Sequence, residues 1–240
     1  MPQHISRKEL KRNEFRESIA HGAEAVVSHQ QTAWTIGGAV LVVALAIFGW
    51  RFYTQRQTVK ADAELTDALK IYEAPIHSDT EPAAPGELTY ATEANRDSDA
   101  EHKFSDIAAR YPRTHPGQIA RFYDALCLEV LGNNDQAEKN LKTLAGGSDA
   151  DLAALARYQL AQMYDKNGRG VEAVALYQQL EEKPSVLVPK ALVLLSLADH
   201  YAQSDPAQAA KLYNQIKTDY SGTPAADQAD ERLELLNTKS

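Results

Sequence analysis

One stretch of nineteen residues, 32–50, contains no charged side chain. Its last eighteen residues would form a helix about 27 Å long, because each helical residue rises about 1.5 Å. That length is close to the hydrocarbon thickness of a bilayer, which is about 30 Å. Trp34 and Trp50 stand near its two ends and Arg51 follows, and both indole rings and cations favour the membrane–water interface. The stretch therefore predicts a transmembrane helix over residues 32–53.

Two other interpretations of this stretch are open from the sequence. A buried core helix is also apolar, although eighteen residues is long for one. A cleaved signal peptide needs a small-x-small site, and residues 44–46 fit that pattern. That site lies inside the apolar run, however, and a long polar segment precedes it. We expect a single-pass anchor preceded by a partly helical tail, residues 1–31, with a capping-box pattern at Ser6 and Glu9.

Charge is distributed unevenly along the chain. Residues 1–31 carry five Lys or Arg and four Asp or Glu, whereas residues 61–240 carry 17 Lys or Arg and 29 Asp or Glu. So acidic a domain repels a phosphate backbone, and we expect no nucleic-acid partner. Basic residues favour the cytoplasmic side of an anchor, but four also follow the anchor closely. The charge bias for a cytoplasmic tail and an external domain is therefore small.

The chain after the anchor begins as helix and is then interrupted. Residues 54–73 place Ala and Leu at helical spacing. Residues 74–98 are rich in Pro and polar side chains, and we interpret them as an irregular insertion. Helical periodicity resumes near Asp99 and continues to about Leu236. We therefore expect residues 54–98 to hold a helix plus an insertion, and residues 99–240 to form a domain of their own.

A repeated pattern with a spacing of 36 residues dominates this last region. Each copy has a first segment with a small residue followed three later by a bulky one, a turn, and a second segment with an apolar stripe. Gly132 and Gly168 occupy matching places in the first two turns. The stripes are Ala137, Leu141 and Leu144; Ala173, Tyr177 and Leu180; Ala209, Tyr213 and Ile216.

This pattern predicts paired helices that stack. An i, i+4, i+7 stripe faces one side of a helix. A single hairpin cannot bury that stripe, but stacked neighbours can. A degenerate copy, Ala100 with Phe104 and Ile107, would pair with residues 54–73, and a last helix from Ala225 would cap the stack. The predicted fold is all-α: one transmembrane helix followed by a helical-hairpin solenoid.

The pattern resembles the tetratricopeptide repeat, whose period is about 34 residues. The small–bulky pair, the turn glycine and the alanine match, whereas the usual tryptophan is missing and the usual proline is absent from most copies. An unrelated helical bundle is the alternative. The whole layout is similar to the ancillary subunit of the bacterial Sec translocon, whose domain is similar to the periplasmic cell-division coordinator. Residues 103–132 resemble that family's helix junction, and the insertion at 74–98 departs from it.

This resemblance implies a place in the bacterial inner membrane with the soluble domain in the periplasm. It also implies a role beside the translocon, handing newly exported chains to envelope chaperones. A factor for envelope or outer-membrane assembly, or for coordinating cell division, is the alternative. An enzyme with an unrecognised site is a third hypothesis. The sequence leaves the identity of the partner and the oligomeric state open.

No motif for catalysis or for a cofactor is present: there is no phosphate-binding glycine loop, metalloprotease pair, paired CxxC or nucleophile elbow. We therefore expect no enzyme, cofactor or metal. The cluster Asp97, Asp99, Glu101 and His102 is interpreted as solvated charge near a helix start. His200 is expected to be packed or on the surface, and the single cysteine, Cys127, to be a packed thiol.

Two arginines are the candidates for partner contact. Arg121 and Arg157 are 36 residues apart, so they occupy equivalent places on successive first helices, which line the concave face of such solenoids. Two guanidinium groups could hold a carboxylate or an acidic peptide. The alternative is a salt bridge of Arg121 to Asp124, or of either arginine to a neighbouring helix. Arg121, Asp124 and Arg157 are thus the predicted residues of a peptide groove.

Overall fold

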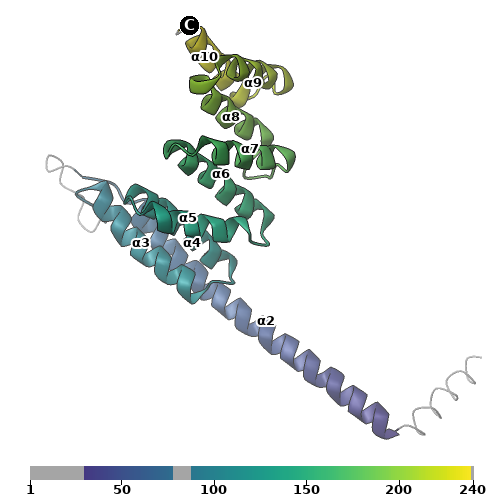
Figure 1. Ribbon diagram of the computed structural model, residues 1–240. Helices are drawn as coiled ribbons and strands as arrows, with labels where there is room; N and C mark the ends of the chain where they lie inside the picture. The colour runs from purple at the N-terminus through teal and green to yellow at the C-terminus, as the bar shows by residue number, and fades with distance from the viewer. Residues whose placement is uncertain (1–29, 78–87, 239–240) are drawn as a thin grey trace, which may run out of the picture. The chain divides into compact units, whose positions relative to one another are not determined.

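The computed structural model describes residues 30–77 and 88–238, and these residues form helices without a β-strand among them (Figure 1). The all-α prediction is therefore confirmed. The described residues divide between two units, with the boundary between residues 56 and 57. The predicted tail helix and its capping box lie outside the described residues.

The first helix of the described residues, α2, runs without a break from Gln30 to Tyr72. It is the one helix of the described segments that is long and apolar enough to cross a membrane, with a mean hydropathy of 1.5 in its most apolar window. Trp34 and Trp50 are 76% and 60% exposed, and Arg51 is exposed too. Water disfavours so much exposed apolar surface, which makes this helix a candidate membrane span.

The end of α2 belongs to the second unit, where it forms a hairpin with α3 (Glu93–Arg110). Ala61, Leu65 and Ala68 share one buried cluster with Ala100 and Phe104. The hydroxyl of Tyr111 donates to Glu64 at 2.9 Å across the same pair of helices. The degenerate copy of the repeat is therefore folded as a helical hairpin.

Helix α3 begins at Glu93, so the expectation of irregular chain up to residue 98 was wrong. Thr92 caps the helix, because its hydroxyl accepts a hydrogen bond from the backbone N–H of Asn95 at 3.2 Å. The first turns of α3 carry few apolar residues, so the sequence shows no helical periodicity there. Residues on either side of positions 78–87 are tied together, since His77 N donates to Tyr90 O at 2.9 Å.

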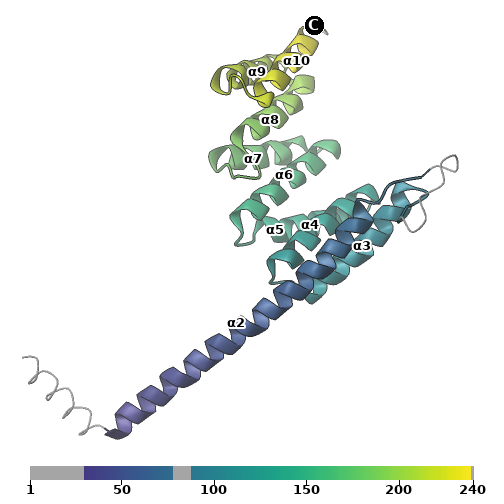
Figure 2. The ribbon, with the colours of Figure 1, turned by 180° about the vertical axis from the view of Figure 1, so that it is seen from behind.

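Three further hairpins and a last helix follow in chain order, each packed on its neighbours (Figures 1 and 2). Figure 2 shows the same stacking from behind. The first helices of the hairpins are α4 (His115–Val130), α6 (Ala150–Lys166) and α8 (Lys190–Ser204). The second helices are α5 (Asn134–Ala145), α7 (Gly170–Glu182) and α9 (Pro206–Asp219), and α10 (Pro224–Thr238) covers α9.

The repeated alanines form the predicted seam. Ala137, Ala173 and Ala209 are each completely buried, and the larger stripe residues Leu141, Tyr177 and Tyr213 are at most 2% exposed. All of them belong to one continuous core cluster. A small side chain at each of these places lets two helix backbones approach closely, so the hairpins stack as the repeat predicts.

The turns of the α4–α5 and α6–α7 hairpins depend on glycine. Gly132 and Gly168 have φ angles of +79° and +74°, in the left-handed region that side chains disfavour. The backbone N–H that follows each glycine reaches back into the first helix, as Arg169 N does to Tyr164 O at 2.8 Å. The turn between α8 and α9 lacks this glycine. There, Asp205 begins α9 by accepting a hydrogen bond from Gln208 N at 3.0 Å.

Candidate partner-binding groove

The first helices present a row of polar and apolar side chains that recurs with the repeat. Leu126, Gln162 and Asp199 lie at equivalent places, 36 and 37 residues apart, and each lines a surface hollow. Two hollows lie along this row. We call them the α6–α8 hollow and the α4–α6 hollow, and together they form the first-helix groove, with Lys166 in the lining of both.

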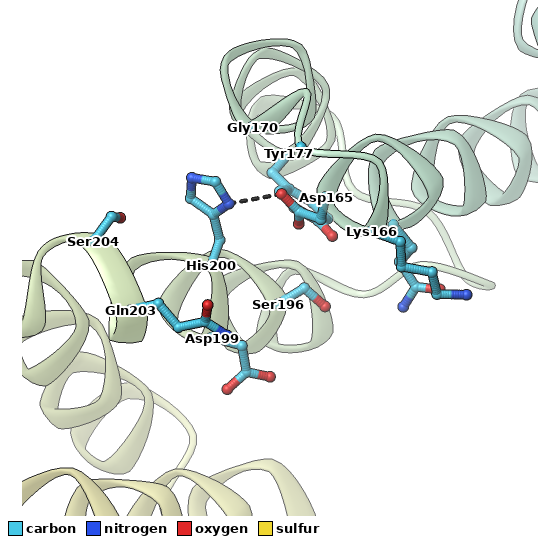
Figure 3. A pocket seen from close by; sticks show the side chains of 11 residues that line it. Asp165, Lys166, Gly170, Tyr177, Ser196, Asp199, His200, Gln203 and Ser204 are labelled. Atoms are coloured by element: carbon cyan, nitrogen blue, oxygen red, sulfur yellow. Dashed lines mark hydrogen bonds and ion pairs between the residues drawn. The ribbon is translucent and has the colours of Figure 1, made fainter. Parts of the chain in front are cut away.

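The α6–α8 hollow has a volume of about 640 Å³ and is lined by the ends of α6 and α8 and the start of α7. Figure 3 shows His200 reaching from α8 to Asp165 at the end of α6. The two side chains are joined by a hydrogen bond of 2.6 Å between His200 Nδ1 and Asp165 Oδ1. Gly170 leaves room for the imidazole, because a Cβ at that position would lie 2.7 Å from His200 Cε1. His200 is thus packed, as expected, and connects two successive repeats.

Two hydroxyl groups of this hollow, those of Ser196 and Tyr177, are engaged or buried away from the imidazole. Ser196 Oγ shares a hydrogen bond of 2.7 Å with the hydroxyl of Tyr158. Tyr177 is buried beneath, and both its burial and the nearby Asp165 carboxylate raise the pKa of its phenol, so the phenol stays protonated. Nucleophilic catalysis needs a hydroxyl bonded to its base. Among the described residues, no serine hydroxyl bonds to His200.

The α4–α6 hollow has a volume of about 440 Å³ and a lining that mixes apolar and polar side chains. Tyr72, Leu126 and Val130 contribute to it, and Val130 is 57% exposed. Polar side chains at its rim link α4 to α6. Glu129 accepts hydrogen bonds from Lys166 Nζ at 2.7 Å and from Gln159 Nε2 at 2.8 Å. The rim carboxylate is therefore already neutralised within the fold.

Asp124, one of the predicted groove residues, is buried. It is 5% exposed and its Oδ2 accepts a hydrogen bond of 2.6 Å from Asn140 Nδ2. Burial and the neighbouring Glu101 carboxylate raise its pKa to about 7, with Asn140 and Arg121 acting in the opposite direction. Its other oxygen, Oδ1, has no hydrogen-bond partner among the described residues. Its carboxyl group faces the core between helices.

The two arginines lie in different surroundings. Arg157 Nη2 donates to the carbonyl oxygen of Ala145, the last residue of α5, where a cation also favours the helix dipole. Arg121 interacts electrostatically with Asp124. Neither lines the first-helix groove as defined above. Equal spacing places them at equivalent positions, but it does not say which neighbour each one faces, so their role in partner contact stays a prediction.

The acidic cluster at the start of α3 is only partly solvated. Asp97 is 1% exposed and accepts a hydrogen bond of 2.9 Å from Arg96 Nε, so the expectation of solvated charge was wrong for this residue. The buried charge is tolerated because it is paired. Asp99 accepts from the hydroxyl of Tyr90 at 3.1 Å. Across the described residues, no group of three or more potential ligands could hold a metal ion.

Cys127 is completely buried, which confirms the prediction of a packed thiol. Burial, together with the nearby Asp97 and Asp124 carboxylates, raises its pKa to about 12. A thiol of this kind carries little thiolate, the reactive form.

Comparison with known proteins agrees with this geometry. The family model described as a tetratricopeptide repeat-like domain matches residues 29–183. The chain belongs to the tetratricopeptide repeat-like family. The match begins at the apolar helix and extends through α7, and α8 and α9 continue the same hairpin geometry beyond it. No curated protein and no solved structure matches the chain. Tetratricopeptide repeat-like domains are typically protein-interaction modules without catalytic activity.

Sequence reasoning missed the residues that line the groove. Gln162, Asp165 and His200 were not proposed as contact residues, although a signal was present. At Leu126, Gln162 and Asp199 the repeat positions change from apolar to polar while the buried stripe stays apolar. A repeated position that tolerates both kinds of side chain faces solvent, and the solvent-facing side of a first helix is where a partner can bind.

Proposed function

We propose that this protein is a membrane-anchored scaffold, held to the bacterial inner membrane by α2, whose first-helix groove lies on the concave side of the solenoid and holds a protein partner in the periplasm. The observation that carries this proposal is that the apolar helix and the hairpins as far as α7 fall within one family match, residues 29–183. An anchor of this kind raises the local concentration of the groove beside a membrane complex.

We further propose that the complex is the Sec translocon, and that the groove passes newly exported chains to envelope chaperones. The layout of tail, anchor and divergent repeats supports this choice, as does the acidic, DNA-repelling character of residues 61–240. The fold supports it too, since a stack of hairpins offers an extended surface to a partner.

Photo-crosslinking in cells tests the proposal. A crosslinking residue at Gln162, in the groove, is expected to capture translocon or chaperone proteins. The matched control is the same residue at Val171, which is 85% exposed and does not line the groove. Equal capture at both positions, or capture of lipid alone at Gln162, would refute a partner-binding groove.

Protease treatment of intact spheroplasts tests the orientation. Digestion of the acidic domain from outside is expected, with the fragment that contains α2 retained in the membrane. Protection of the domain until the membrane is lysed would place it in the cytoplasm and exclude the periplasmic role.

An envelope-assembly or cell-division factor is the second candidate. It is favoured by one observation: residues 57–240 form a compact unit of their own, which could act without an anchor. Deleting residues 30–56 distinguishes the translocon scaffold from the assembly factor, because the translocon role requires the anchor. Full complementation by the exported, anchorless protein would favour the assembly factor.

A further inference from the structure

We propose that the first-helix groove selects one class of segment: an extended stretch of polypeptide in which a bulky apolar side chain is flanked by lysine or arginine. This inference rests on the proposed scaffold function and goes further, because it names the chemistry of what the scaffold holds. Three properties of the groove carry it.

The first property is a set of apolar side chains at one end, among them an exposed valine. In the α4–α6 hollow, Val130 is 57% exposed although it lies in the last turn of a helix whose other face is core. Leu126 and the ring of Tyr72 line the same hollow, and the buried Met163 forms part of it. Burying apolar surface here is favourable by about 25 cal/mol per Å². The hollow therefore suits one apolar side chain.

The second property is a pair of unused amides at the other end. Gln162 and Gln203 line the α6–α8 hollow, and no hydrogen bond of the described residues uses either side-chain amide. A primary amide offers both donors and an acceptor. Two of them on successive first helices can bond the N–H and C=O groups of an extended main chain, whatever its side chains.

The remaining polar groups of the groove are already engaged. Asp165 bonds to His200, and Asp199 accepts from the hydroxyl of Tyr213 at 2.6 Å and pairs with Arg232. Lys166 is held by Glu129. These groups shape the groove, and a partner that displaced them would lose as much as it gained. Recognition by main-chain bonds and apolar contact avoids that cost.

The third property is charge. Residues 57–240 contain 18 Lys or Arg and 29 Asp or Glu, an excess of eleven carboxylates. Such a field attracts cationic segments and repels anionic ones, and it acts mainly on the rate of association. Glu129, Asp165 and Asp199 lie in the groove but are already engaged by Lys166, His200 and Arg232, so the preference for cationic segments comes from the excess of carboxylates over residues 57–240 as a whole. An acidic peptide, which the two arginines suggested from sequence, is disfavoured by this surface.

Binding of three labelled peptides to the full-length protein in neutral-lipid nanodiscs tests the inference. Each has about twelve residues, which reach about 40 Å when extended. One has an apolar centre with lysine flanks, one the same centre with glutamate flanks, and one a serine centre with lysine flanks. We expect the first to bind tightest, by about tenfold over each of the others at low salt. Added salt should shrink its advantage over the glutamate peptide but not over the serine peptide.

Variants locate the binding in the groove. Val130→Ser should weaken the apolar–lysine peptide several-fold and leave the serine peptide unchanged, whereas Gln162→Ala with Gln203→Ala should weaken all three alike. Val171→Ser, at a valine that is still more exposed and lies outside the groove, is the control and should change nothing. Circular dichroism of each variant should match that of the wild type, since all of these positions are partly or fully exposed.

Two results would overturn the inference. Equal affinity for the lysine and glutamate peptides would remove the charge preference, and wild-type binding by Val130→Ser would remove the apolar site. Either result leaves the scaffold function standing, because a scaffold needs only a partner of some chemistry. Loss of every crosslink from Gln162 in cells would instead overturn the scaffold itself.

Discussion

Asn140 on α5 donates a hydrogen bond of 2.6 Å to the buried carboxyl group of Asp124 on α4. This is the central contact of a polar cluster in which Glu101 of α3 and Arg121 of α4 also act on Asp124. The second carboxyl oxygen of Asp124 is buried without a partner among the described residues. The cluster therefore favours a protonated Asp124, and its stability must depend on pH.

The first prediction concerns that dependence. The pKa of Asp124 is about 7 in the fold against 3.8 for the free group, so the native state binds a proton more tightly than the unfolded state does. Its contribution is fully present below about pH 4 and is lost as the pH rises through about 7. Asp124→Asn keeps the shape of the side chain and removes the loss of stability at high pH, because an amide does not ionise. We expect the variant to gain roughly 2–4 kcal/mol relative to wild type between pH 4 and pH 8.

Urea denaturation at pH 4, 6 and 8 measures this difference. Asp106→Asn is the matched control, because Asp106 is an exposed carboxylate on α3. A stability difference between Asp124→Asn and wild type that stays constant with pH would contradict the buried, protonated carboxyl.

The second prediction concerns Glu138, which behaves in the opposite way. Burial alone would raise its pKa, but hydrogen bonds from Lys142, Tyr164 and Arg169 lower it to about 2. Its contribution to stability is therefore present above about pH 4.5 and is lost as the pH falls toward 2. Glu138→Gln should cost about 1–3 kcal/mol at pH 7, and the difference from wild type should diminish below pH 4.5.

Thermal or urea unfolding from pH 2 to pH 7 tests this expectation. Glu182→Gln, an exposed residue at the end of α7, is the control and should have little effect. If Glu138→Gln were as harmless as the control at pH 7, the network that joins α5, α6 and α7 would not be a stabilising one.

The third prediction concerns the turn between α6 and α7. Gly168 has a φ of +74°, whereas Gly146 at the end of α5 has a φ of −90°. A Cβ at Gly146 would make only ordinary contacts, the nearest at 3.7 Å. Gly168→Ala should therefore destabilise the domain by about 1 kcal/mol and Gly146→Ala should not. Equal effects in equilibrium unfolding would show that the left-handed turn is not required.

The fourth prediction concerns the fit between Gly170 and His200. A methyl group at position 170 would lie 2.7 Å from His200 Cε1, so Gly170→Ala should displace the imidazole from Asp165. We expect a cost of about 1–2 kcal/mol that disappears in the His200→Ala background, where the space is free. A double-mutant cycle measures this coupling. Additive effects of the two substitutions would mean that the imidazole is not held there.

The sequence was sufficient for the features that depend on local patterns. An uncharged stretch of bilayer length specifies the apolar helix α2, and three aligned stripes specify the hairpins that bury Ala137, Ala173 and Ala209. Left-handed turns were predictable from Gly132 and Gly168, because few other residues adopt that conformation.

Tertiary structure decided the features that depend on which neighbour a side chain meets. A spacing of 36 residues makes Arg121 and Arg157 equivalent, but only packing turns Arg157 to the carbonyl of Ala145. Likewise, Asp165 and His200 are 35 residues apart and meet because two first helices end side by side. Periodicity records the face of a helix, whereas the partner on that face is set by the helix packed against it.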